Sequence, residues 1–400
     1  MTAGMTVIAA PPRNNAVVLV AFTAYGALWG PYLAALPEVR AATGATTGQL
    51  GLALLVGAVA ALPAMAWVGR LLDRFGRVVV ASVLVLFAVT AVLPTTAGSV
   101  PGLVVSIALF GFGSGACNVV VVALASAAET RTGARVMNRA HALFSVGVLV
   151  CSALTGLVAT AGVPARAVSV VLAIGLVGWV WAVRDSFPRH VGRQERSARR
   201  ERTPGAVRPR IRPVPLLVLL AGLAMLVESG VQQWSAVFLS DVLDAAPPWS
   251  AAAPGVFAGM MAAGRLGGHW LSVRATDRTL LQAAGLVSGV GVLLIATAAE
   301  PLIALAGTAL VGAAISVVTP VTYGLAGRGA PSGERGALIG ATASLANLGL
   351  LLGPAVVGQI ADRSDLRTAM VVLAPVCLAV CLLGRRTATV PVLAEERKSP

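Results

Sequence analysis

Glu228 is the one carboxylate that lies deep inside a long apolar stretch of this sequence, which makes it the first candidate for chemistry. An ionised acid at the centre of a membrane costs at least about 2.5–3.5 kcal/mol on insertion scales, so such acids usually face a cavity. Gln232 follows four residues later, on the same face of a helix. The pair predicts a site that binds a proton or a cationic group. The alternative is a neutral Glu228 that only joins two helices by hydrogen bonds.

Other polar and aromatic side chains interrupt further apolar stretches. Tyr25 and Trp29 are four residues apart and form an aromatic stripe, Asn118 follows three closely spaced glycines, and Tyr323 follows Pro320. A ligand-binding role competes with a hydrogen bond between helices for Asn118 and with an interfacial aromatic belt for Trp29. We expect the substrate and proton site to comprise Glu228, Gln232, Asn118, Tyr25, Trp29 and Tyr323.

A charged loop at 69–77 separates two long apolar stretches and reads Gly-Arg-Leu-Leu-Asp-Arg-Phe-Gly-Arg. Gly69 and Gly76 permit a short turn without a Cβ clash. The three arginines of the loop indicate a cytoplasmic position, because short loops rich in Lys and Arg stay on that side of a membrane. Asp73 is the one acid among these cations, and we expect it to make a specific contact.

Composition restricts the class of protein that can hold these residues. The chain has 400 residues, of which 57% are hydrophobic and 12% charged, and its mean hydropathy is +0.86. Only a membrane protein with several spans accommodates so much apolar surface. The net charge of +14 does not indicate a nucleic-acid partner, because the arginines sit between apolar segments. They predict contact with anionic lipid headgroups instead.

Catalytic and metal-binding patterns are scarce. The three histidines, His141, His190 and His269, are far apart, and the four cysteines lie inside apolar stretches. We find no nucleophile elbow, phosphate loop or metalloprotease motif. The sequence therefore predicts no enzyme activity, no cofactor and no metal site.

Twelve apolar runs follow one another as six, a break and six, which predicts an all-α membrane protein with twelve transmembrane helices. An even number of spans places both termini on one side. Of the thirty basic residues only Arg40, Arg166, Arg363 and Arg367 fall on the opposite side. The termini are therefore expected in the cytoplasm. The predicted segments are an N-terminal stretch at 1–16, a six-helix half at 17–184, an Arg- and Pro-rich linker at 185–213, a second six-helix half at 214–384 and a tail at 385–400.

The spacing of the 69–77 loop closely resembles the signature between the second and third helices of the major facilitator superfamily. The resemblance implies two pseudo-symmetric halves and a central cavity lined by helices one, four, seven and ten. It also implies that Asp73 lies near the start of the eleventh helix, around Gly336, and that Arg77 meets Glu129. The implied cytoplasmic gate comprises Gly69, Asp73, Arg74, Gly76, Arg77 and Glu129.

Stretches at 111–118, 137–145 and 234–239 resemble the fucose-permease-like branch of this superfamily and its uncharacterised bacterial relatives. The resemblance implies a monomeric secondary transporter of the inner membrane that moves a small organic solute by alternating access, coupled to protons. The single acid of the cavity and its few other polar groups slightly favour efflux. A proton-coupled importer of sugars or metabolites is the alternative, although such sugar permeases usually carry an acid at the position of Asn118. A membrane sensor that kept the fold without transport is the alternative of another class.

Overall fold

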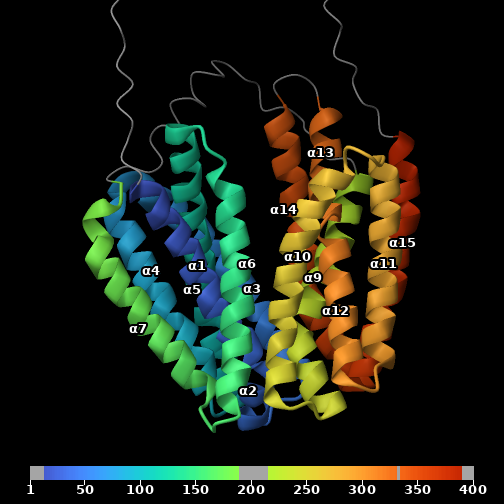
Figure 1. Cartoon of the computed structure of the whole chain (residues 1–400), viewed down its shortest axis with the longest axis horizontal. Coiled ribbons are helices and arrows are strands. Elements are labelled where there is room, and N and C mark those ends of the chain that lie inside the picture. The colour runs from blue at the N-terminus through green and yellow to red at the C-terminus, as the bar shows by residue number, and fades with distance from the viewer. Residues whose placement is uncertain (1–12, 189–214, 331–333, 390–400) are drawn as a thin grey trace, which may run out of the picture.

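The computed structural model of this protein describes residues 13–188, 215–330 and 334–389 (Figure 1). Within these ranges the chain forms helices and no strands. Of the predicted segments, most of the N-terminal stretch, most of the linker and most of the C-terminal tail lie outside the described residues.

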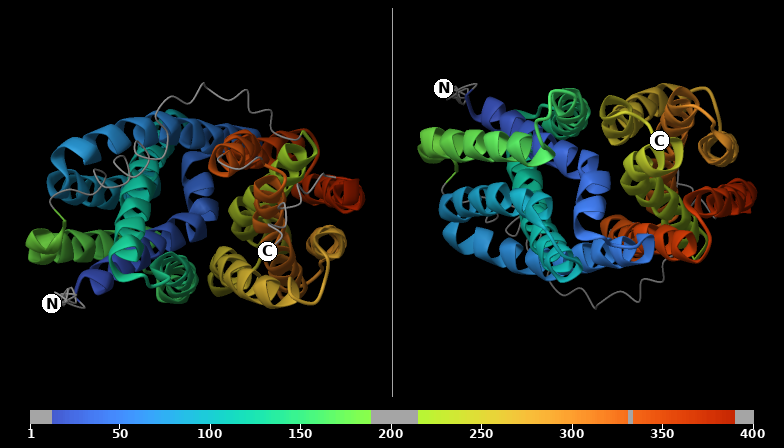
Figure 2. Two further views of the ribbon diagram at one scale, coloured as in Figure 1. Left: turned by 90° about the horizontal axis from the view of Figure 1, so that it is seen from above. Right: turned by 90° about the horizontal axis from the view of Figure 1, so that it is seen from below.

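Two groups of long helices lie side by side, and Figure 2 separates them when viewed along the helices. The first group contains α1 (Arg13–Ala34), α3 (Thr47–Phe75), α4 (Arg77–Val92), α5 (Val100–Thr132), α6 (Val136–Ala159) and α7 (Ala165–Val183). The second contains α9 (Pro215–Leu243), α10 (Pro247–Leu271), α11 (Asp277–Thr297), α12 (Pro301–Ile315) with α13 (Val318–Arg328), α14 (Arg335–Arg363) and α15 (Leu366–Gly384). The predicted all-α fold with twelve membrane-crossing segments is confirmed.

Eleven helical segments of the described chain are long and apolar enough to cross a membrane, and α10 is the twelfth crossing segment by length and position. Its 25 residues include several glycines and prolines together with Arg265 and His269, which lower its mean hydropathy. A crossing helix tolerates such residues where it faces protein or a water-filled cavity and not lipid.

Two local features differ from the predicted runs. The tenth run, predicted as one segment, breaks between α12 and α13, at Ser316 and Val317. Pro320 explains the break, because its ring clashes with the carbonyl four residues earlier and it offers no N–H. A short helix, α2 (Leu36–Thr43), follows α1 and ends at Gly44, whose φ of +66° suits glycine.

Glycines bring helices into close contact inside each half. A Cβ added to Gly111 of α5 would lie 2.0 Å from the backbone oxygen of Gly57, and one added to Gly349 of α14 would lie 1.8 Å from that of Gly222. Small residues permit this approach of backbones in membrane helices. Both glycine-rich stretches therefore pack closely against a neighbouring helix.

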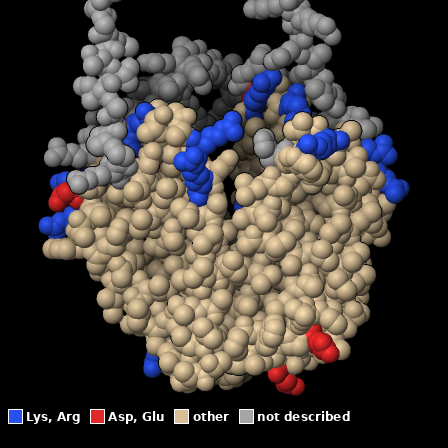
Figure 3. Space-filling view, in the orientation of Figure 1, with Lys and Arg blue, Asp and Glu red and all other residues tan. Residues whose placement is uncertain are grey.

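Charge divides the molecule into two ends. The basic end carries the 69–77 loop, the first turn of α1 and the last turn of α15, and Figure 3 shows Lys and Arg gathered there. The acidic end carries Glu38, Asp241, Asp244, Glu300, Asp362 and Asp365, together with the four arginines predicted on that side.

The two halves meet at the acidic end and separate toward the basic end. Gly156 of α6 packs on Pro247 of α10, and Gly358 of α14 packs on Thr47 of α3. All of these residues belong to the parts of their helices nearest the acidic end. The space-filling view shows a hollow between the halves at the basic end (Figure 3).

Candidate functional site

Packing of α9 against α14 sets the direction in which Glu228 points. The indole N–H of the fully buried Trp234 donates to the backbone oxygen of Pro354 at 2.9 Å, and Ser229 faces Gly353. This face of α9 is therefore occupied by α14. Glu228 lies near the middle of the 29-residue α9, deep within the protein, yet its side chain is only half-buried, as is that of Gln232. Part of the surface of each side chain is therefore left uncovered by the surrounding helices.

Arg265 and His141 join this site, although sequence reasoning did not place them there. The guanidinium of Arg265 in α10 acts electrostatically on Glu228 of α9 and on His141 of α6. The charge of Glu228 acts in turn on the hydroxyl of Tyr323 in α13. No direct ion pair joins Glu228 and Arg265 in the part of the chain that the structure describes. Both halves thus contribute to one polar cluster.

Arg265 lies inside a helix although it is flanked by glycines. Helix α10 continues to Leu271, so Arg265 lies almost two turns before its end, with an exposed side chain. The signal that could have identified this residue is the low hydropathy of its whole run, which is typical of a cavity-lining helix.

Tyr25 and Trp29 converge on one serine of α5. The Tyr25 hydroxyl lies 3.0 Å from the Ser114 hydroxyl oxygen, and the Trp29 indole N–H donates to the same oxygen at 3.2 Å. Tyr25 is buried, and its ring contacts Phe87 and Phe144, each with a centroid distance of 5.1 Å. These contacts join α1 to α5.

The part of this aromatic region that remains available to a ligand is small. Trp29 is half-buried, and its ring meets Phe110 edge-on at a centroid distance of 5.0 Å. Asn118, also half-buried, follows Ser114 by four residues and lies on the same face of α5. Ligand binding by Tyr25, Trp29, Asn118 and Tyr323 stays a prediction.

The predicted loop at 69–77 is almost entirely helical. Residues 69–75 form the last turns of α3 and α4 begins at Arg77, so only Gly76, at a φ of +47°, lies between the two helices, and Gly69 makes no turn. Arg77 lies 3.4 Å from a carboxylate oxygen of Asp185. Glu129 instead accepts a hydrogen bond from the backbone N–H of Met137 at 2.9 Å. The predicted contact of Arg77 with Glu129 is therefore not made in this conformation, and it stays a prediction for one in which the basic ends approach each other.

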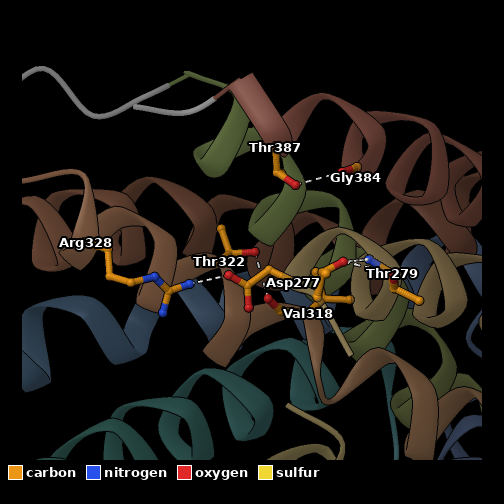
Figure 4. A network of polar contacts seen from close by, with 8 residues as sticks. Asp277, Thr279, Val318, Thr322, Arg328, Gly384 and Thr387 are labelled. Atoms are coloured by element: carbon orange, nitrogen blue, oxygen red, sulfur yellow. Dashed lines mark hydrogen bonds and ion pairs between the residues drawn. The ribbon is translucent and has the colours of Figure 1, made fainter. Parts of the chain in front are cut away.

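At the basic end of the second half, Arg328 of α13 donates to the carboxylate of Asp277, in the first turn of α11 (Figure 4). The Thr322 hydroxyl donates to the Val318 backbone oxygen at 2.7 Å within α13 (Figure 4). Both contacts stay within one half, so they stabilise the bundle without joining the halves.

At the acidic end, in contrast, ion pairs and hydrogen bonds join one half to the other. Arg40 of α2 forms an ion pair with Asp241 of α9. Beside this pair lies a hollow of about 460 Å³, lined among others by Thr46, Asp362 and Asp365.

In the described ranges, no group of three or more His, Cys, Asp and Glu side chains could hold a metal ion. The described structure combines two helical bundles that meet at one end, a hollow between them at the other end (Figure 3), and polar side chains contributed by both bundles. These features define a membrane transporter of the two-bundle type.

The sequence model of the Major Facilitator Superfamily matches residues 17–342 and 276–400. The chain belongs to the Major Facilitator Superfamily of transporters, as its sequence resemblance predicted. An uncharacterized transporter of Sinorhizobium fredii, y4wD, is 28% identical over 382 residues, which cover 92% of this chain and 96% of the relative.

Solved structures share the fold at low sequence identity. A bacterial homolog of the human lysosomal transporter Spinster, in an inward-facing and occupied conformation, gives a TM-score of 0.74 at 14% identity over 96% of this chain and 98% of that one. The fucose:proton symporter of E. coli gives 0.56 at 17% identity over 94% of this chain and 98% of that one.

Proposed function

We propose that this protein is a monomeric secondary transporter that moves a small organic solute by alternating access. The observation that carries the proposal is the half-buried Glu228, with Arg265 and Tyr323 near it, in a molecule whose halves meet at one end only. Solved relatives named for fucose and proton transport support a small solute and a proton as the transported species.

The basic end is assigned to the cytoplasm and the acidic end to the outside of the inner membrane, following the distribution of arginines. On this assignment the hollow of Figure 3 opens to the cytoplasm, and the described conformation faces inward. The site residues are then in contact with cytoplasmic water while the acidic end is closed.

Glu228 is the proposed coupling residue. When its carboxylate is ionised, the Arg265 guanidinium stabilises the charge. When the site is closed and empty, the cost of an ionised acid away from water favours the protonated form. Gln232, one turn away, can hydrogen-bond either form. Efflux remains slightly favoured over uptake of a sugar or metabolite, because few other uncharged polar groups line the site.

The test begins with a thermal-shift screen of purified protein against a metabolite and drug library, followed by flux of the hits in proteoliposomes. Glu228→Gln keeps shape and hydrogen bonding but cannot titrate. We expect it to abolish pH-driven accumulation while exchange of a neutral substrate continues. Unchanged accumulation with unchanged pH dependence would make Glu228 structural only. Wild-type protein that binds a ligand without carrying it would instead be a membrane sensor.

A further inference from the structure

Helices α3 and α14 belong to different halves and meet at the acidic end, where the first turn of α3 lies against the last turns of α14. A Cβ added to Gly51 would lie 3.0 Å from the backbone oxygen of Pro354. The two helices therefore touch backbone to backbone. Any opening of the acidic end must break this contact.

Asp362 of α14 binds the N-terminus of α3 across this boundary. Its carboxylate accepts a hydrogen bond from the backbone N–H of Gly48 at 3.1 Å and one from the Thr47 hydroxyl at 3.4 Å. Gly48 is the second residue of α3, so its N–H has no partner inside the helix. A carboxylate is also favoured there by the positive end of the helix dipole.

Two other residues of the first turn of α3 also cap each other. Thr46 and Gln49 form a reciprocal capping box, with the Thr46 hydroxyl accepting from Gln49 at 3.2 Å and the Gln49 side chain accepting from Thr46 at 3.0 Å. The N–H of Gly48 is left for α14. Gln359, one turn before Asp362, donates to the Gly48 backbone oxygen at 3.0 Å. Both backbone groups of Gly48 are therefore bound by the other half.

Only glycine fits at position 48. A Cβ built there would lie 2.7 Å from a carboxylate oxygen of Asp362 and 3.0 Å from its Cβ. The approach of Asp362 to the helix therefore depends on the missing side chain. A larger residue would move the carboxylate away from the N–H that it accepts from.

We propose that Asp362 is the latch of the acidic end: a carboxylate of the second half that closes this end by capping the first turn of α3 in the first half. Charges around it cooperate, with the Arg40 and Asp241 ion pair crossing the same boundary and Arg363 adjoining the carboxylate. The latch rests on the proposed alternating access, in which this end must open.

The experiment measures a distance and needs no solute, so its failure leaves the flux test untouched. Spin labels are placed at Thr160→Cys and Ala299→Cys, exposed positions at the acidic end of the two halves, in full-length protein with its four native cysteines replaced. The protein is reconstituted in lipid nanodiscs. Pulsed electron paramagnetic resonance then gives the distribution of distances between the two labels. The long and short distances in it give the ratio of molecules with an open acidic end to molecules with a closed one.

Asp362→Asn should raise the open-to-closed ratio by roughly two- to fivefold, because the amide oxygen can still accept from the backbone N–H of Gly48 but the negative charge that the helix dipole favours is lost. The matched control is Asp365→Asn. Asp365 lies three residues away and caps its own helix, accepting from the N–H of Thr368 at 2.8 Å, so the ratio should stay at the wild-type value.

A second pair of variants tests the same contact without changing charge. Gly48→Ala should open the acidic end, whereas Gly98→Ala, where a Cβ would meet nothing within 4 Å, should not. Size-exclusion chromatography and circular dichroism verify that each variant is folded. The latch is overturned if Asp362→Asn and Gly48→Ala both give the wild-type distance distribution, or if Asp365→Asn opens the end equally.

Discussion

At the scale of single residues, the polar groups of the candidate site differ in whether they already have a hydrogen-bond or ion-pair partner within the protein. Ser114 accepts the Trp29 indole N–H and lies within hydrogen-bonding distance of the Tyr25 hydroxyl, so these predicted ligand contacts act first as a joint between α1 and α5. Glu228 and Arg265 are different, because they influence each other without direct pairing. A carboxylate that is not held in a direct ion pair stays available to a proton or a solute.

Replacing Arg265 with glutamine should uncouple transport from the proton gradient. Without the guanidinium the ionised form of Glu228 loses its nearest described stabilising charge, so the carboxylate keeps its proton through the cycle. We expect pH-driven accumulation in proteoliposomes to fall about tenfold, which corresponds to the loss of about 1.4 kcal/mol of stabilisation.

The control for this prediction is Arg274→Gln. Arg274 lies outside the site, where its guanidinium carbon is 3.7 Å from the centroid of the Trp270 ring. Its loss should therefore leave accumulation near the wild-type level. Equal defects in both variants would indicate a general effect of losing positive charge at this end.

At the scale of elements, glycine and proline decide how the helices run and pack. Pro320 separates α12 from α13, and Gly349 allows α14 to touch the backbone of α9 at Gly222. These residues carry no chemistry, but they set the rotation and tilt of the helices that hold Glu228 and Tyr323. Changes at such contacts should therefore affect stability more than substrate choice.

Gly349→Ala should destabilise the second half by about 1–3 kcal/mol, the usual cost of overpacking a filled interface. Its new Cβ would lie 1.8 Å from the Gly222 backbone oxygen. Gly340→Ala, in the same helix with no atom within 4 Å of the added Cβ, should be neutral or stabilising, since alanine favours helix. Thermal unfolding in detergent compares the two, and equal melting temperatures would contradict the packing argument.

At the scale of the whole molecule, the two ends are closed by different sets of charges. The acidic end is joined by Arg40 with Asp241 and by Asp362 at Gly48. The basic end has its predicted counterpart in Asp73 and the first turn of α14, a contact expected when that end closes. Alternating access then requires that one set breaks as the other forms.

Reversing the Arg40 and Asp241 pair tests this view at the acidic end. Arg40→Asp alone places like charges together and should favour the open acidic end, as should Asp241→Arg alone. The double variant restores an ion pair and should return the distance distribution toward the wild type. The same spin-label measurement checks it, and a double variant as open as either single one would show that the pair does not contribute to closure.

Asp73→Asn tests the basic end. We expect it to weaken closure there, so that a cysteine placed at Gln232 reacts faster with a soluble thiol reagent added from the basic side and transport falls. Asp277→Asn is the control, because Asp277 pairs with Arg328 inside one half. If Asp73→Asn leaves both reactivity and transport unchanged, the predicted gate is wrong.

The sequence by itself determined the membrane class and the twelve crossing segments, and it made Glu228 the first candidate for chemistry. Apolar length, the distribution of charge and a lone intramembrane acid are local properties, so they can be identified without coordinates. Glycine spacing is a local property as well, and missing side chains permit close packing wherever helices meet.

Only the tertiary structure decided which distant residues share a site. Arg265 and His141 join Glu228 because α6, α9 and α10 turn particular faces toward one space, and Asp362 reaches Gly48 across more than three hundred residues of sequence. Such pairings depend on the rotation of each helix about its axis and on which end of the molecule is closed. Neither quantity is encoded in the period or the hydropathy of a single segment.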